Sequence, residues 1–201
     1  MLAKIVLATR NLHKAQELSR ILESLHGGIE VLTVADFPDA PEVEETEDSF
    51  AGNALLKARA LVKHTGLPTV ADDSGLCVDA LAGAPGVLSA RWSGATENVD
   101  EENLNLVLKQ MLHTPDENRG AQFVCAAALV MPDGTEVVEL GVVEGRLLRE
   151  RRGTEGFGYD PIFVPKGFAM TTAEMSPEQK DAISHRGEAL RKLAMKLNDL
   201  I

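Results

Sequence analysis

Short apolar runs alternate with helical patterns along the first third of the chain. Residues 4–8 and 30–34 are brief apolar stretches typical of buried strands. Between them, residues 11–25 carry an apolar side chain at every third or fourth position, which predicts an amphipathic helix. A second helical pattern begins near Ser49 and stops at Gly66, and a strand follows at residues 69–71. This alternation indicates an α/β protein.

The remaining two thirds of the chain add an antiparallel element. Residues 100–112 have helical periodicity, whereas residues 122–131 and 135–143 flank a Pro-Asp-Gly turn and predict a β-hairpin. Three glycines make residues 153–158 a loop, and residues 176–179 combine a capping box with proline at the first helical position. We therefore expect one α/β domain over residues 1–201, with a mixed sheet and helices on its faces.

Composition narrows the class of protein. The chain has 201 residues and a net charge of −11, so it lacks the basic character typical of proteins that bind nucleic acid. Its longest apolar run, residues 124–131, is too short to span a bilayer. Cys77 and Cys125 are too few for a disulfide framework. We expect a cytoplasmic protein that binds neither nucleic acid nor membrane.

A candidate phosphate site lies where the first strand meets the first helix. Thr9, Arg10, Asn11 and Lys14 occupy this junction, and a helix N-terminus presents free N–H groups and a positive dipole end. An ordinary capped helix with a surface lysine would give the same pattern. The glycine-rich signature of a P-loop is missing here.

A candidate metal site follows the strand at residues 69–71. We expect Asp72-Asp73-Ser74-Gly75 to form a turn there, and adjacent carboxylates repel unless a cation such as Mg²⁺ compensates them. Because neighbours in a strand point to opposite faces, only one aspartate is expected to face the metal directly. A local Asx turn is the alternative interpretation. Glu44 and Glu45 belong to an acidic loop that is either a second ligand source or a solvated surface.

Three further groups could recognise a nucleotide. Asn53 and Lys57 lie one helical turn apart, although a lysine at such a position often simply reaches to solvent. The segment Phe157-Gly158-Tyr159-Asp160 places aromatic rings beside flexible glycine, where they could stack on a base or anchor a core. His185 and Arg186 can donate hydrogen bonds, or they can belong to a helix start. Together these groups supply polyphosphate cations, metal carboxylates and base contacts.

With these motifs in order, the sequence resembles the inosine triphosphate pyrophosphatases, also called non-canonical purine NTP pyrophosphatases. The matching segments span nearly the whole chain: residues 7–14, 50–58, 71–76, 156–163 and 184–187. The resemblance implies hydrolysis of ITP, dITP and XTP to the monophosphate and pyrophosphate. It also implies an elongated fold with two lobes around a long mixed sheet, an active site in the cleft between the lobes, and a homodimer.

The resemblance also assigns roles to residues by motif position. Asp73 would activate water and, with Glu44, bind Mg²⁺, while the choice between Glu44 and Glu45 stays open and Asp72 is a neighbour without an assigned role. Arg10 stands where the family often has glycine. The residues expected to contact substrate are Thr9, Arg10, Asn11, Leu12, His13, Lys14, Asn53, Lys57, Ser74, Phe157, Gly158, Tyr159, Asp160, Lys180, His185 and Arg186.

Two rival functions share these residues. One is a pyrophosphatase of related fold that acts on modified pyrimidine or canonical nucleotides, and a panel of substrates distinguishes it. The other is a nucleotide-binding sensor without catalysis, which the presence of Asp73, Lys14 and Lys57 makes less suitable.

Overall fold

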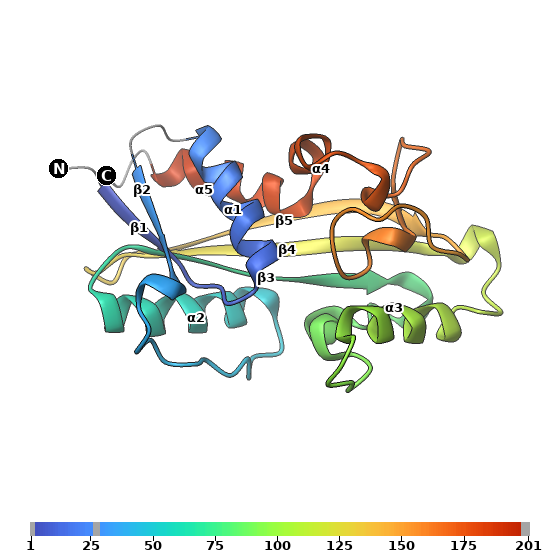
Figure 1. The fold of residues 1–201 in the computed structure, drawn as a ribbon, viewed down its shortest axis with the longest axis horizontal. Helices are drawn as coiled ribbons and strands as arrows, with labels where there is room; N and C mark the ends of the chain where they lie inside the picture. The colour runs from blue at the N-terminus through green and yellow to red at the C-terminus, as the bar shows by residue number, and fades with distance from the viewer. Residues whose placement is uncertain (1–2, 26–28, 198–201) are drawn as a thin grey trace. The chain divides into compact units, whose positions relative to one another are not determined.

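A computed structural model describes residues 3–25 and 29–197 and contains one six-stranded mixed sheet (Figure 1). The strand order is β2-β1-β3-β4-β5-β6, with β1 parallel to β2 and β3, and β5 antiparallel to β6. The strands are β1 (Ala3–Leu7), β2 (Ile29–Thr33), β3 (Thr69–Val78), β4 (Gly120–Val130), β5 (Glu136–Leu147) and β6 (Phe163–Pro165). The helices are α1 (Leu12–Leu25), α2 (Phe50–Thr65), α3 (Val99–Gln110), α4 (Pro177–Ile183) and α5 (His185–Leu197). The mixed α/β prediction is confirmed.

The chain divides into two compact units. The first comprises residues 1–73, 125–141 and 185–201, and the second comprises residues 74–124 and 142–184. Strands β3, β4 and β5 each continue from one unit into the other. No helix in the described ranges is both long and apolar enough to cross a membrane.

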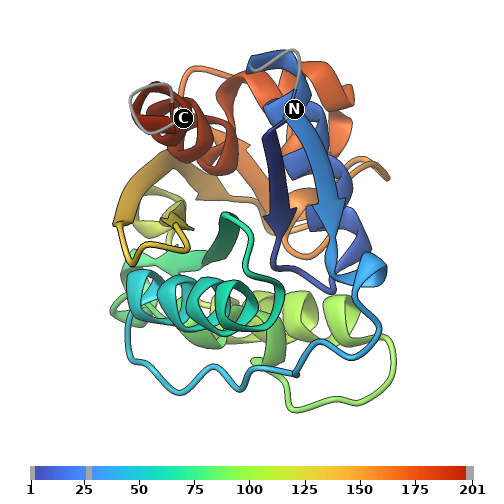
Figure 2. The same cartoon turned by 90° about the vertical axis from the view of Figure 1, so that its left-hand side faces the viewer.

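In the first unit, helices cover both faces of the sheet. Helices α1 and α5 pack on one face and α2 packs on the other (Figures 1 and 2). The alternation of side chains along β1 explains this layering, because Ile5 and Leu7 join the core under α1 and α5 whereas Val6 joins the core under α2. Strand β3 alternates in the same way, with Val70 on the first side and Ala71 on the second.

Helix α2 begins and ends where its sequence predicts. The hydroxyl of Ser49 accepts a hydrogen bond from the N–H of Gly52 at 3.2 Å, which caps the N-terminus. At the other end Gly66 adopts a left-handed conformation with φ of +69°, and its N–H donates to the carbonyl of Val62. The helix therefore presents Asn53 and Lys57 from a fixed position.

In the second unit, α3 packs its apolar face against β3 and β4. Leu104 and Val107 are buried with Leu76 in one cluster. The rings of Phe123 and Phe163 lie 4.6 Å apart, centroid to centroid, in the same cluster. The sequence did not reveal β6, which contributes Phe163 to this core and is only three residues long.

The predicted turn at Asp72-Asp73-Ser74-Gly75 is wrong. These residues continue β3, which extends to Val78. Asp, Ser and Gly are typical of turns because of their local hydrogen bonding and flexibility, but here tertiary contacts decide. A Cβ on Gly75 would meet the carbonyl oxygen of Gly86 and the hydroxyl of Ser89, so the glycine serves a close approach of two segments.

Candidate active site

The predicted phosphate-binding turn connects β1 to the N-terminus of α1. Asn11 caps the helix, because its Oδ1 accepts the backbone N–H of Lys14 at 3.1 Å. The hydroxyl of Thr9 accepts the N–H of Asn11 at 3.2 Å, so the turn is held by its own side chains. The side chains of Leu12 and His13 are exposed, with Leu12 at 76%. A helix of this length offers an anion its N–H groups and positive dipole end.

Arg10, the residue that departs from the family pattern, contacts the acidic loop. Its Nη2 donates to the carbonyl of Ala40 at 2.8 Å. The guanidinium therefore connects the turn between β1 and α1 to the segment that leads to Glu44 and Glu45.

Asp72 lies on the face of β3 that α1 and α5 cover. Its Oδ2 is 3.2 Å from the ammonium of Lys14 and 3.2 Å from Nε of Arg186, and the side chain is fully buried. Burial raises the pKa of Asp72, but Lys14 and Arg186 outweigh it and hold the pKa below its ordinary value. Asp72 is therefore an ionised anchor for two cations.

Asp73 lies on the opposite face, beside α2. Its Oδ2 accepts a hydrogen bond from Nδ2 of Asn53 at 3.1 Å, and its Oδ1 is 3.7 Å from the ammonium of Lys57. Lys57 also donates to Oε1 of Glu45 at 2.9 Å. Burial raises the pKa of Asp73, with a further rise from the charge of Glu45, and Lys57 only partly opposes both. A carboxylate with a raised pKa is a better proton acceptor.

These contacts test whether the site fits a metal ion. Within residues 3–25 and 29–197, no group of three or more acidic, histidine or cysteine side chains is gathered around one point. Mg²⁺ typically uses only one or two carboxylates together with water and phosphate oxygens, so a pair is sufficient. Asp73 and Glu45 both contact Lys57, whereas Glu44 is exposed. The carboxylate chemistry of Asp73 and the acidic loop fits Mg²⁺, and the choice between Glu44 and Glu45 as the second ligand stays a prediction.

In the second unit, Asp160 organises the predicted base-contacting segment. This aspartate is 3% exposed, and its Oδ2 accepts hydrogen bonds from Nζ of Lys180 at 2.6 Å and from the N–H of Phe157 at 2.9 Å. Its Oδ1 accepts the hydroxyl of Thr172 at 2.7 Å. The ammonium of Lys180 also lies 4.9 Å from the centre of the Phe157 ring. Asp160 thus positions an aromatic ring and a cation together.

Several predicted base contacts have other partners in the structure. The backbone N–H of Gly158 donates to Asp100 at 3.1 Å. The hydroxyl of Tyr159 donates to the carbonyl of Ser89 at 2.8 Å, and its ring belongs to the core. His185 and Arg186 begin α5 and are 5% and 3% exposed. Contact between these residues and a base stays a prediction, as does contact through Ser74, which is half-buried.

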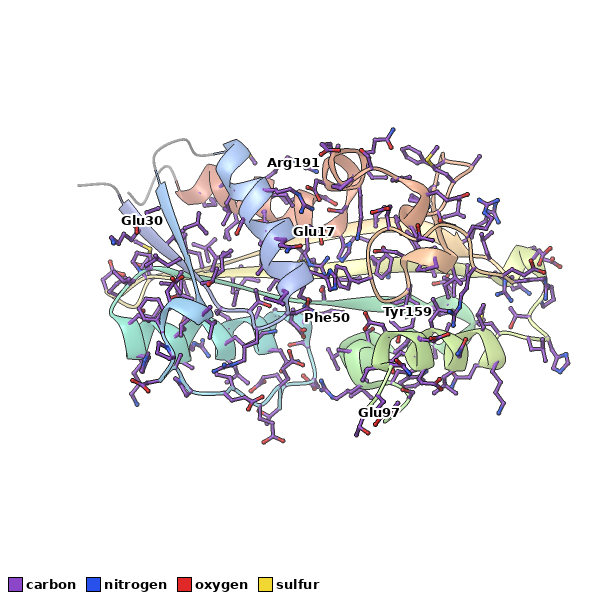
Figure 3. All side chains as sticks on the ribbon, viewed as in Figure 1. Glu17, Glu30, Phe50, Glu97, Tyr159 and Arg191 are labelled. Atoms are coloured by element: carbon purple, nitrogen blue, oxygen red, sulfur yellow. The ribbon has the colours of Figure 1, made fainter. Side chains whose placement is uncertain are left out.

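Sequence reasoning missed Glu17, which extends from α1 (Figure 3). It is 3% exposed, and its Oε2 is 2.7 Å from Nη1 of Arg186. The signal was present in the pattern, because Glu17 lies three residues after Lys14 and beside Leu18 on the buried face of the helix. A carboxylate on an apolar face is rare without a partner.

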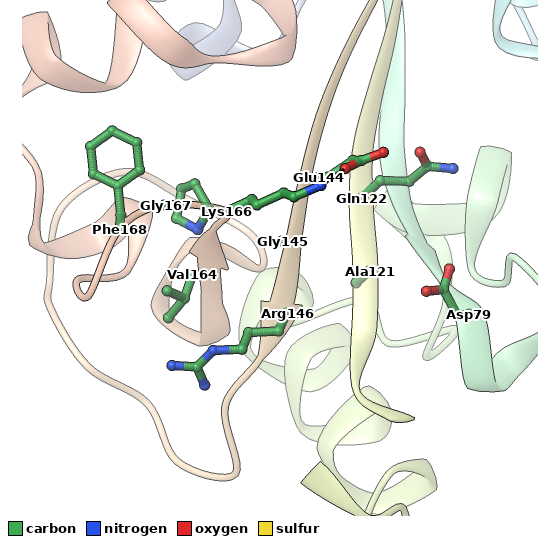
Figure 4. Close-up of a pocket in the computed structure, with 11 residues that line it drawn as sticks. Asp79, Ala121, Gln122, Glu144, Gly145, Arg146, Val164, Lys166, Gly167 and Phe168 are labelled. Atoms are coloured by element: carbon green, nitrogen blue, oxygen red, sulfur yellow. Dashed lines mark hydrogen bonds and ion pairs between the residues drawn. The ribbon is translucent and has the colours of Figure 1, made fainter. Parts of the chain in front are cut away.

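One open cavity is lined by none of these groups (Figure 4). It has a volume of about 580 Å³ and lies in the second unit, where Lys166 donates to Glu144 at 2.9 Å. None of the residues that line it is among the predicted substrate contacts. This cavity therefore takes no part in the nucleotide hypothesis.

Comparison with protein-family models identifies the chain. The model of the Ham1 family matches residues 5–196. The chain belongs to the Ham1 family. This agrees with the resemblance found in the motifs. Among curated Ham1 relatives, the dITP/XTP pyrophosphatase of Mycobacteroides abscessus is 55% identical over 199 residues, covering 98% of this chain and 96% of that protein. The dITP/XTP pyrophosphatase of Streptomyces avermitilis is 50% identical over 200 residues, covering all of both chains.

Solved structures of Ham1 relatives have the same fold. The nucleoside-triphosphatase, or dITP/XTP pyrophosphatase, of Mycobacterium abscessus is 56% identical, with a TM-score of 0.76 over 94% of this chain and 98% of its own. A HAM1 protein from Coxiella burnetii is 41% identical, with a TM-score of 0.86 over 98% of this chain and 99% of its own. The fold predicted from the motifs is confirmed.

Proposed function

We propose that this chain is an Mg²⁺-dependent pyrophosphatase that converts ITP, dITP and XTP to the monophosphate and pyrophosphate. The observation that carries the proposal is the arrangement on β3. Asp72 binds Lys14 at the N-terminus of α1, while Asp73 on the other face meets Asn53 and Lys57 of α2. The names of the dITP/XTP pyrophosphatases among its relatives support the same activity.

The triphosphate is held by the first unit. The N-terminus of α1, with Thr9, Asn11 and Lys14, provides N–H groups and a cation for phosphate oxygens. Lys57, 15% exposed, offers a second ammonium near Asp73. Positive charge fixed before the reaction stabilises the pyrophosphate leaving group without a cost of reorganisation.

Asp73 accepts the proton of the attacking water. Asn53 fixes the orientation of the carboxylate through the 3.1 Å hydrogen bond to Oδ2. Without a bound cation, burial and the charge of Glu45 raise the pKa of Asp73. Asp73 and Glu45 would hold Mg²⁺, which when bound neutralises phosphate charge during the displacement. With this assignment Glu45 replaces Glu44 as the second ligand.

Base selectivity depends on hydrogen-bond polarity. The ring of Phe157 offers a stacking surface that every base can use. The ammonium of Lys180 lies beside that ring and can donate to the 6-oxo group of hypoxanthine or xanthine. The 6-amino group of adenine cannot accept this hydrogen bond, and an unsatisfied buried donor costs about 1–3 kcal/mol. His185 and Arg186 remain candidates for further contacts with the base.

The cellular setting follows the family resemblance. We propose that the protein acts in the cytoplasm as a homodimer. Cys77 and Cys125 are free thiols within the described part of the chain, which suits a reducing compartment. Light scattering coupled to size-exclusion chromatography measures the molar mass, and a monomer at micromolar concentration would contradict the dimer.

A substrate panel tests the activity. The purified protein is mixed with ITP, XTP, dITP, GTP or ATP and Mg²⁺, and the release of pyrophosphate and orthophosphate is measured separately. We expect pyrophosphate from ITP, dITP and XTP, with no turnover in EDTA and recovery when Mg²⁺ is added back. Orthophosphate as the product, or full activity in EDTA, would refute the proposal.

A further inference from the structure

We propose that Glu17 is a positioning residue, which holds Lys14 in place for phosphate by acting through Arg186 and Asp72. This inference rests on the proposed function, because it assigns Lys14 to the triphosphate. It adds a residue that the motifs did not assign.

The four side chains form one continuous series of ion pairs in the first unit. Glu17 Oε2 is 2.7 Å from Arg186 Nη1, Arg186 Nε is 3.2 Å from Asp72 Oδ2, and the same oxygen is 3.2 Å from Lys14 Nζ. Two cations therefore balance two carboxylates. Lys14 has 16% of its side chain exposed, whereas the other three have 4% or less. Lys14 is thus the member that can reach a ligand.

Glu17 determines how Arg186 divides its hydrogen bonds. A guanidinium that faces a single carboxylate tends to bind it with two parallel N–H groups. Here Nη1 is directed to Glu17 and Nε to Asp72, so Arg186 contacts the two carboxylates through separate nitrogens. Asp72 Oδ2 then remains within reach of Lys14.

Two features suit a role beyond packing. Glu17 and Lys14 are three residues apart on α1, so one rigid helix carries both the phosphate ligand and the residue that controls its neighbours. In addition, Oε1 of Glu17 is buried and accepts no hydrogen bond from the part of the chain that the structure describes. A purely structural buried carboxylate is normally satisfied at both oxygens.

Loss of the Glu17 charge has a specific consequence. Arg186 would turn both N–H groups to Asp72 and compete with Lys14 for that carboxylate. Lys14 would then lose its anchor and its alignment with the phosphates. The effect of Glu17 on activity should therefore depend on the presence of Lys14.

A double-mutant cycle tests this dependence. Glu17→Gln, Lys14→Met and the double variant are compared by kcat/KM for ITP and, independently of turnover, by the affinity for inorganic tripolyphosphate in calorimetry. We expect Glu17→Gln to lower both quantities about tenfold in the wild-type background, within the range of coupling for residues in one network. In the Lys14→Met background we expect less than about a twofold further loss, which a general packing defect would not produce.

Two variants keep the outcome clear. Glu188→Gln is the matched control, because it removes a carboxylate that lies 2.7 Å from Lys192 on the same helix as Arg186 but is 40% exposed, and its effect should be small in both backgrounds. Glu17→Asp retains the charge on a shorter side chain, and it replaces Glu17→Gln in the cycle if that variant does not fold. Equal losses in both backgrounds would overturn the proposal. Coupled tripolyphosphate affinity without ITP turnover would support the role of Glu17 and refute the proposed function instead.

Discussion

Separate replacement of Asp72 and Asp73 by asparagine makes the same chemical change on opposite faces of β3. Asp72 is enclosed by Lys14 and Arg186, whereas Asp73 is held by Asn53 and raised in pKa by its surroundings. We therefore expect the first variant to lose stability and the second to lose activity.

The cost of Asp72→Asn follows from the buried ion pairs. The substitution leaves Lys14 and Arg186 with one carboxylate, Glu17, where two were present. Breaking a buried pair by removing one partner costs about 3–5 kcal/mol. For a chain of this size each kcal/mol shifts the melting temperature by roughly 2–4 °C, so we expect Tm to fall by about 6–20 °C.

Asp73→Asn should behave differently. Burial already disfavours the charged form of Asp73, and an asparagine oxygen can still accept the hydrogen bond from Asn53. In metal-free buffer we expect the free energy of unfolding to change by less than about 1 kcal/mol, the net scale of one hydrogen bond. The loss of the proton acceptor should lower kcat by about 10²-fold or more.

The assay pairs urea unfolding in EDTA with initial rates of ITP hydrolysis in Mg²⁺ for the wild type and both variants. Control experiments confirm that each variant is folded under the assay conditions. Near wild-type kcat for Asp73→Asn, or equal stability losses for the two variants, would refute the assignment of Asp72 as the structural anchor and Asp73 as the proton acceptor.

Three further outcomes follow from named contacts. Lys14 and Arg186 hold the pKa of Asp72 below the ordinary 3.8 despite its burial, so the ionised Asp72 stabilises the folded protein fully at neutral pH. The difference in unfolding free energy between the wild type and Asp72→Asn should therefore shrink as pH falls below about 4, and a difference that stays constant would contradict this. Lys180→Met removes the cationic partner of buried Asp160 and should cost about 3 kcal/mol in urea unfolding, whereas Lys166→Met at the exposed Glu144 pair should have no measurable effect. Equal effects of the two substitutions would refute this distinction between buried and exposed pairs. Glu45→Gln should raise the Mg²⁺ concentration for half-maximal activity more than Glu44→Gln does, and the reverse order would restore Glu44 as the ligand.

Local signals in the sequence were sufficient to predict the ends of helices that have clear capping residues. Ser49 and Gly66 fixed α2 because capping depends on residues within one turn, and the capping box at Ser176 likewise begins α4. The spacing of Asn53 and Lys57 indicated that they lie one helical turn apart on α2. Such features need no information about distant parts of the chain.

Long-range contacts explain what the sequence did not reveal. Asp72 to Gly75 have turn chemistry, yet they remain in β3 because cations from α1, α2 and α5 compensate the carboxylates. The partnership of Glu17 with Arg186 joins residues 169 positions apart, which no local pattern predicts. The contact between Lys57 and Glu45, on which the proposal of Glu45 as the second ligand rests, joins residues 12 positions apart and likewise required the structure.

Competition between ITP and ATP in ¹⁸O-labelled water tests the central claim most directly. Both nucleotides are mixed at equal concentration with the enzyme and Mg²⁺, and ³¹P NMR follows their consumption and the products. We expect ITP to give IMP and pyrophosphate, with ¹⁸O on the phosphate of IMP, because water attacks the α-phosphorus. ITP should be consumed at least ~10²-fold faster than ATP, equivalent to about 2.7 kcal/mol. Equal consumption of the two nucleotides, or IDP and orthophosphate as products, would contradict the account.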